Sequence, residues 1–206
     1  MRKLVFIYLL LLPLVAAFGQ GSKSMYTEGE RFFAQKNYAE AAKCYEKAVK
    51  AGDDMLAPER LITCYEEMKD YKKAAKWAKR ATDDGSPTAA MKLCEYYMYG
   101  MGVKHDPEKA IEIYRKWIDE TEYPRAMVGL GICYQEGIGV EQSDSDAYYW
   151  FRNAARLGDA EGQYLTAYYC FQGKGTLQDY KAASEWAQKA AAQGHADAAA
   201  LLRKIP

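Results

Sequence analysis

RAMVGLGICYQEGIGVEQSDSDAYYWFRNAARLG, from Arg125 to Gly158, is the stretch that decides the fold. Apolar and small residues recur at helical spacing on both sides of its glycine-rich segment, which predicts two amphipathic helices. Gly137 and Gly139 allow backbone angles that other residues avoid, so they end the first helix abruptly. Gly158 ends the second helix in the same way. The stretch therefore predicts one helical hairpin.

Imperfect copies of this hairpin make up the sequence on either side of it. One alanine marks the second predicted helix of each copy, and the spacings between these alanines are 33, 36, 37 and 35 residues: Ala41, Ala74, Ala110, Ala147 and Ala182. Repetition at such a period is typical of helical arrays, in which each unit packs against its neighbours. We therefore expect an all-α array of stacked hairpins.

A capping residue precedes each of these second helices: Asn37, Asp70, Asp106, Ser143 and Asp179. Such side chains accept hydrogen bonds from the free N–H groups of a helix's first turn. Asn37 with Glu40, and Ser143 with Asp146, also approximate a capping box. We interpret the aspartates as caps and not as catalytic acids.

Glycine pairs close the first helices of three copies: Gly100/Gly102, Gly137/Gly139 and Gly173/Gly175. A phosphate-binding glycine motif follows a strand and opens a helix, whereas these pairs end helices. The pairs therefore predict hairpin hinges and argue against a nucleotide site.

The three C-terminal copies resemble Sel1-like repeats. The resemblance rests on these positions of the central copy: Ala126, Leu130, Gly131, Tyr134, Gly137, Gly139, Val140, Ala147, Trp150 or Phe151, Ala154, Ala155 and Gly158. Two departures occur in the last copy, where Cys170 replaces the tyrosine and Thr176 the valine. The first two copies lack the glycine turn and look closer to tetratricopeptide repeats.

Both families imply a right-handed α-solenoid of antiparallel helix pairs. We expect two tetratricopeptide-like pairs at 22–85, three Sel1-like repeats at 86–194 and a C-terminal capping helix at 195–206. Cysteine-rich members of the Sel1 family pair two cysteines within each repeat. This chain has one cysteine per repeat, so such bracing is not implied.

The N-terminal segment differs from the repeats. Arg2 and Lys3 precede an apolar run that is too short for a comfortable membrane span and ends in a small-x-small pattern at Ala17 to Gly19. This pattern predicts a signal peptide at 1–19, cleaved before Gln20; the alternative is an uncleaved anchor. We expect a periplasmic or secreted protein with no membrane association after cleavage.

Charge and cysteine content narrow the classes of partner and site. The 206-residue chain has a formal net charge of zero, so nothing in its overall charge favours nucleic acid or an anionic membrane. The five cysteines stand singly among apolar residues of predicted helices, which favours buried thiols: Cys44, Cys64, Cys94, Cys133 and Cys170.

Catalytic chemistry has little support in the sequence. The two histidines, His105 and His195, lie far apart at unit junctions. No zinc-ligand spacing and no nucleophile-elbow pattern occurs. We therefore expect no enzyme activity, no metal site and no cofactor.

Stacked helix pairs leave a concave surface lined by their first helices, which suits a protein or peptide ligand. The tetratricopeptide alignment implies these groove residues: Tyr26, Glu30, Phe33, Glu59, Thr63, Glu66, Met91, Glu95, Met98, Val128, Ile132, Gln135, Tyr164, Tyr168 and Phe171. Tyr164, Tyr168 and Phe171 share one helical face, and the alternative is that this aromatic stripe is core between repeats.

A basic stripe occupies one predicted face of the second copy: Lys69, Lys72, Lys76, Lys79 and Arg80. A stripe of this kind is usually the solvated outer face, and binding of an acidic partner is the alternative. For the whole chain we expect an exported protein-interaction scaffold. The alternative, which the Sel1 resemblance suggests, is binding of a cell-wall component such as a peptidoglycan fragment or a β-lactam-like ligand.

Overall fold

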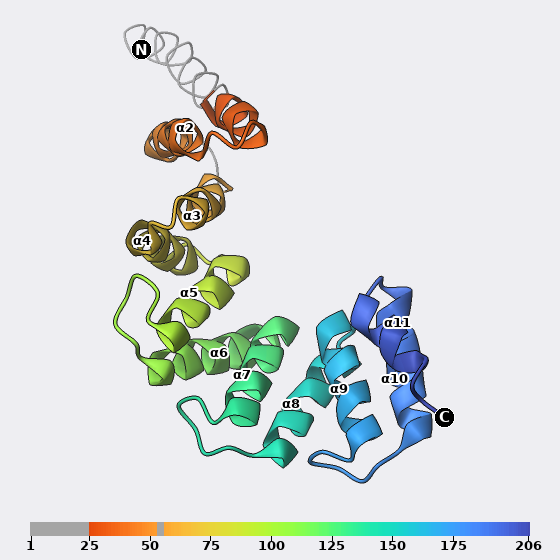
Figure 1. Ribbon diagram of the computed structural model, residues 1–206. Helices are drawn as coiled ribbons and strands as arrows, with labels where there is room; N and C mark the ends of the chain where they lie inside the picture. Colours follow the sequence, from red (N-terminus) through yellow and green to blue (C-terminus); the bar gives the residue numbers. More distant parts are fainter. Residues whose placement is uncertain (1–24, 53–55) are drawn as a thin grey trace, which may run out of the picture. The chain divides into compact units, whose positions relative to one another are not determined.

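The computed structural model describes residues 25–52 and 56–206 (Figure 1). The signal peptide predicted at 1–19 lies outside these residues. Within the described residues, 25–34 are helical, and ten further helices follow: α2 (Tyr38–Ala51), α3 (Ala57–Glu67), α4 (Tyr71–Asp83), α5 (Pro87–Tyr99), α6 (Pro107–Thr121), α7 (Pro124–Glu136), α8 (Asp144–Arg156), α9 (Ala160–Gln172), α10 (Tyr180–Ala192) and α11 (Ala196–Leu202).

The fold is an α-solenoid of helical hairpins, as the repeats predict, and the described residues contain helices without strands. Sequential helices pack together, most closely in the pairs α3–α4, α7–α8 and α9–α10. The chain forms two compact units, one of described residues up to Leu93 with Met101–Val103, the other of Cys94–Gly100 and Lys104–Pro206. No helix within the described ranges is both long enough and apolar enough to cross a membrane.

The predicted caps are confirmed at all five second helices. In α6, for example, the Asp106 carboxylate accepts a hydrogen bond from the Lys109 N–H at 3.2 Å. The same bond forms at the other four caps: Asn37, Asp70, Ser143 and Asp179. Each helix start is therefore fixed by a local side chain.

The capping boxes predicted at Asn37 and Ser143 do not form. In a capping box, the third helical residue would bind the N–H of the cap. The Asn37 N–H instead donates to the carbonyl of Phe32, and the Ser143 N–H donates to that of Tyr134, both at 2.9 Å. Glu40 pairs with Lys43 at 2.6 Å. The N–H of the cap therefore closes the hairpin by binding the preceding helix.

This closing hydrogen bond distinguishes two kinds of turn. It spans five residues in the first two hairpins, as from Asp70 back to Tyr65, and nine in the other three, as from Asp106 back to Tyr97. The longer turns contain the glycine pairs, and each glycine has a positive φ angle. In the shorter turns Lys36 and Lys69 take the left-handed conformation instead, with φ of 57° and 59°. The four extra residues thus form the glycine loop.

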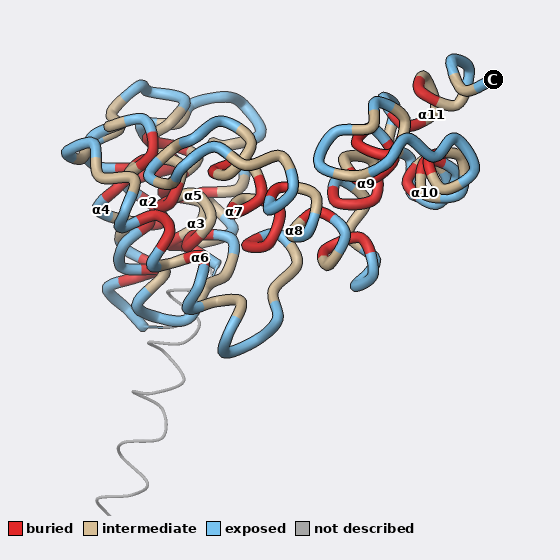
Figure 2. The backbone as a smooth tube through the Cα atoms, turned by 90° about the horizontal axis from the view of Figure 1, so that it is seen from below, coloured by how far each residue is buried: buried red, intermediate tan, exposed pale blue. Residues whose placement is uncertain are grey.

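Small residues bring the paired helices close together. The repeated alanines at 41, 74, 110 and 147 are fully buried, and Figure 2 shows such buried segments on the packed sides of the helices. In the last hairpin the fully buried residue is Ala183 and not Ala182, which is partly exposed. Ala183 lies four residues after its cap, as in the other hairpins, so the repeat alignment there shifts by one.

The five thiols lie in the core, as predicted: Cys44, Cys64, Cys94, Cys133 and Cys170 are all buried and free. Burial raises the pKa of Cys64 to about 12 and that of Cys133 to about 11. These side chains therefore act as small apolar groups, because their thiolate forms are disfavoured.

Candidate functional site

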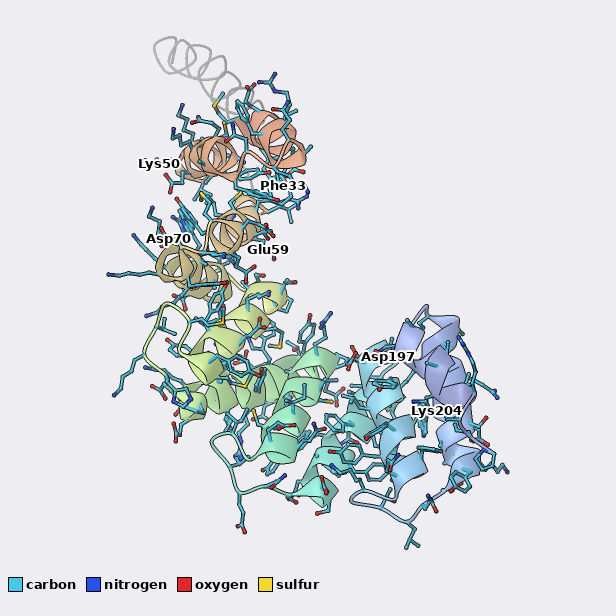
Figure 3. All side chains as sticks on the ribbon, in the orientation of Figure 1. Phe33, Lys50, Glu59, Asp70, Asp197 and Lys204 are labelled. Atoms are coloured by element: carbon cyan, nitrogen blue, oxygen red, sulfur yellow. The ribbon has the colours of Figure 1, made fainter. Side chains whose placement is uncertain are left out.

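A hollow of about 290 Å³ opens on the first-helix side of the N-terminal unit. We call it the α3 hollow, and its residues come from residues 25–34, α3 with its N-terminal cap Leu56, and α5: Tyr26, Leu56, Glu59, Arg60, Ile62, Thr63, Glu66, Thr88, Ala89 and Lys92. Four of them are predicted groove residues: Tyr26, Glu59, Thr63 and Glu66. The structure thus gathers these four at one site, and Figure 3 shows Glu59 and Phe33 on the same side of the unit.

Two carboxylates of the α3 hollow are held by neighbours from the next hairpin. The Ser86 hydroxyl donates to the Glu59 carboxylate at 2.5 Å and also accepts the Ala89 N–H at the start of α5. The Lys92 ammonium lies 3.2 Å from the Glu66 carboxylate. Fixed side chains of this kind present acceptors and donors at defined positions, which reduces the entropy lost on binding a ligand.

Arg60 links the α3 hollow to the first hairpin. Its guanidinium contacts the Glu30 carboxylate at 2.8 and 3.0 Å, and it lies over the Phe33 ring, 5.1 Å from the ring centre. A hydrogen bond with Tyr26 raises the pKa of the Arg60 guanidinium above its ordinary value. Tyr45 completes the cluster, since its hydroxyl donates to Glu30 at 2.6 Å. Two predicted groove residues, Glu30 and Phe33, therefore orient Arg60.

The chemistry of the α3 hollow suits an extended peptide. Its floor includes the buried side chains of Ile62 and Ala89, and its rim carries both carboxylates and cations. An apolar floor can take one or two side chains, while the polar rim can bond to peptide N–H and C=O groups. The volume lies at the small end of the range for sites that bind drug-sized ligands.

In the C-terminal unit, some predicted groove residues are core. Met98 and Val128 are buried, at 8% and 7% exposure, and the Cys133 thiol lies 3.6 Å from the Met98 sulfur. Ile132 is partly buried and packs against the cluster that contains Val128. Of the other α5 positions, Met91 in the N-terminal unit and Glu95 in the C-terminal unit are half-buried. Met98 and Val128 are therefore core residues, which the groove alignment did not anticipate.

The predicted aromatic stripe on α9 also contains both packed and exposed side chains. Tyr164 stacks on the His195 ring with centres 4.6 Å apart, and Tyr164 and Phe171 pack against the cluster around Leu201 of α11. Tyr168 between them is exposed, at 37%. On α7, the Gln135 side-chain oxygen accepts a hydrogen bond from the Tyr169 hydroxyl. Tyr168 is therefore the α9 aromatic that remains available to a partner.

The groove alignment missed Arg60, Lys92, Ile62 and Thr88. The alignment assigns the same few positions in the first helix of every repeat to the groove. It therefore does not identify side chains that reach the hollow from other positions of these helices. The pairing of Arg60 with Glu30 joins residues that are 30 positions apart. The only indication of Arg60 in the local sequence is that it directly follows Glu59, a predicted groove residue.

The basic stripe is exposed along α4, opposite the buried Ala74, Ala78 and Ala81, as expected. Lys69 is an exception, because it lies in the preceding turn with a φ of 59° and α4 begins at Tyr71. The stripe on the helix therefore comprises Lys72, Lys76, Lys79 and Arg80.

Sequential helical hairpins of this kind define a helical-repeat protein. The Sel1 repeat model matches residues 16–53, 67–86, 87–121, 124–159 and 160–195. The chain therefore belongs to the Sel1 repeat family. The match includes the first hairpin and the second helix of the second hairpin, α4, whereas almost all of α3 lies between two matched ranges.

Similar proteins include a solved Sel1 repeat protein from Oxalobacter formigenes, with 30% identity, coverage of 87% of this chain and 74% of the other, and a TM-score of 0.71. The chitin synthase regulator SKT5 of Malassezia restricta is 32% identical over 61% of this chain and 9% of its own length. Chitin synthase regulatory factor 3 of Schizosaccharomyces pombe is 31% identical over 75% of this chain and 15% of its own length. The chain thus spans less than a sixth of either curated relative.

Proposed function

We propose that this protein is a non-catalytic scaffold that binds a segment of a protein partner in the α3 hollow. The observation that carries the proposal is the convergence of Tyr26, Glu59, Thr63 and Glu66 on one hollow with an apolar floor and a rim of both charges. The family and the relatives named as regulators support a role in binding rather than catalysis.

The expected ligand is an extended peptide that inserts one or two apolar side chains over Ile62. Its backbone would bond to rim groups that are already held by neighbours, namely Glu59 by Ser86 and Glu66 by Lys92. A preorganised rim favours binding because little side-chain freedom is lost. Peptide segments in loops or termini of the partner would fit this requirement.

Thr63→Arg tests the site because the long side chain would fill the hollow from α3. Affinity capture from the native host, quantified by mass spectrometry, should recover a partner with the unaltered chain and lose it with Thr63→Arg. Thr82→Arg is the matched control, since both threonine hydroxyls bond to a carbonyl four residues earlier in a helix and both are partly buried. Equal capture by the two variants would contradict the proposal.

The same Thr63→Arg variant also tests the alternative that the ligand is a cell-wall component. Purified sacculi should leave the protein in the supernatant on sedimentation if its ligand is a protein segment. Co-sedimentation that Thr63→Arg abolishes would assign the α3 hollow to a cell-wall component instead.

We also propose export of the protein, on the basis of the sequence at residues 1–19. N-terminal sequencing of the protein purified from its host should give a chain that begins at Gln20. A chain that keeps residues 1–19 would contradict cleavage, and its recovery with membranes would favour the uncleaved anchor.

A further inference from the structure

A second hollow, of about 300 Å³, lies between α2 and α4. We call it the Trp77 hollow, and its lining consists of Glu46, Lys50, Lys76, Trp77 and Arg80. Figure 3 shows Lys50 on the side of the N-terminal unit opposite to Glu59 and Phe33. The Trp77 hollow is therefore distinct from the α3 hollow.

Three cations and one aromatic ring line this hollow. Lys50, Lys76 and Arg80 are exposed, and the Arg80 guanidinium lies 5.3 Å from the centre of the Trp77 ring. Arg80 is 3.8 Å from Asp84, a long contact between exposed groups. Over residues 25–52 and 56–206, neither Lys50 nor Lys76 forms an ion pair or hydrogen bond. The local charge is thus positive, although the whole chain is neutral.

The neighbouring surface extends this charge. α4 carries Lys72, Lys73, Lys76, Lys79 and Arg80 against a single acidic residue, Asp83. Among the α4 lysines, Lys73 alone forms an ion pair with a residue that the structure describes, Asp70, at 3.1 Å. Clustered cations of one sign attract an anionic partner and orient its approach.

Glu46 indicates which kind of anion fits. One of its carboxylate oxygens accepts the Tyr65 hydroxyl at 2.7 Å, so the carboxylate is fixed at the edge of the hollow. Its second oxygen can accept a hydrogen bond from a peptide N–H group. A peptide offers an N–H donor at nearly every residue, whereas the phosphates of a polyphosphate chain have no N–H group to donate to this oxygen. An aromatic or aliphatic side chain can lie on the Trp77 ring.

We propose that the Trp77 hollow binds an acidic peptide segment in which carboxylates flank an apolar side chain. The carboxylates would pair with Lys50, Lys76 and Arg80, and the apolar side chain would contact Trp77. This site lies outside the proposed partner groove, so it gives the scaffold a second and independent point of attachment.

A fluorescein-labelled peptide of glutamates around a central phenylalanine provides the test, measured by fluorescence anisotropy with the full chain. Binding should weaken about fivefold in a Lys50→Gln/Lys76→Gln variant, since exposed charge pairs each contribute modestly. It should weaken further as salt is added, because exposed pairs are screened. A peptide with alanine in place of phenylalanine should bind less tightly.

Lys116→Gln/Lys181→Gln is the matched control, because both lysines are exposed on other helices and their loss removes the same charge. Thr63→Arg should leave peptide binding unchanged, which separates this site from the α3 hollow. Absence of binding, or equal affinity in the two double variants, overturns the proposal. Polyphosphate or phosphatidylglycerol vesicles that bind more tightly than the peptide, with the same dependence on Lys50 and Lys76, also overturn it.

Discussion

Gly175 lies directly against the main-chain carbonyl of Asp144, where α8 begins, so that a Cβ atom on the glycine would overlap that carbonyl. Gly102 meets the carbonyl of Tyr71 at the start of α4 in the same manner, and Gly139 meets Pro107 at the start of α6. The first glycine of the pair ends the helix, as Gly137 does for α7 and Gly173 for α9, while the second glycine lets the loop pack on the preceding hairpin.

Gly175→Ala should destabilise the protein more than Gly158→Ala does. Both glycines have positive φ angles, 59° and 92°, so alanine is strained at either position. Nothing lies within 4 Å of a Cβ at Gly158, so there we expect only the strain cost, about 1–2 kcal/mol. Urea unfolding followed by circular dichroism measures both, and equal losses would show that the contact with Asp144 is unimportant.

His195 should stabilise the C-terminal end through its cap on α11. Its Nδ1 accepts the Ala198 N–H at 3.3 Å, and its Nε2 lies 2.9 Å from the Glu161 carboxylate. His195→Ala should therefore cost about 1 kcal/mol in the free energy of unfolding. His195→Asn keeps a capping acceptor and should cost less. Equal losses in urea unfolding would indicate that stacking on Tyr164 matters and the cap does not.

Tyr45 should make the protein sensitive to alkali. Burial, together with the hydrogen bond to Glu30, raises the pKa of Tyr45 above its ordinary value of 10.0. Above about pH 10 the unfolded chain loses this proton while the folded chain keeps it, so the free energy of unfolding falls as pH rises. Urea midpoints measured from pH 9 to pH 11 should fall less steeply in Tyr45→Phe than in the unaltered protein.

Tyr99→Phe supplies the baseline for that comparison, because Tyr99 is 58% exposed. Its pH profile should follow that of the unaltered protein. A Tyr45→Phe profile with the same slope would show that Tyr45 is not the group responsible.

The five thiols should resist labelling in the folded protein. Burial raises the pKa values of Cys64 and Cys133 to about 12 and about 11, and only the thiolate reacts readily. A thiol reagent at neutral pH should therefore modify all five cysteines in urea and almost none in buffer. Rapid labelling of the folded chain would show that the hairpins open more readily than their packing indicates.

Local features of this fold could be predicted from the sequence, and contacts between hairpins could not. Asp106 is followed by Pro107 and an amphipathic helix, so its role as a cap follows from its neighbours in the chain. Ala182 and Ala183 are adjacent, and the buried one is Ala183, which lies four residues after the predicted cap Asp179, so the spacing from the cap could have identified it. The contact of Gly175 with Asp144 depends on how hairpins stack, which the glycine itself does not indicate.

The candidate site shows the same limit. Glu59, Thr63 and Glu66 line one hollow, and their position on one face of α3 follows from the period of a helix alone. The corresponding positions at Met98 and Val128 do not face a groove, because packing within the C-terminal unit buries their side chains. Arg60 was missed because its position depends on Glu30, in another hairpin.

Site-specific photo-crosslinking tests the central claim most directly. A photoreactive amino acid is placed at Thr63, in the α3 hollow, and in a second variant at Thr82, outside it. In the native host we predict one partner protein crosslinked from position 63 and absent from position 82, with the crosslinked partner residues in a single short segment. Crosslinking of the same partner from position 82 but not from position 63 would contradict the account.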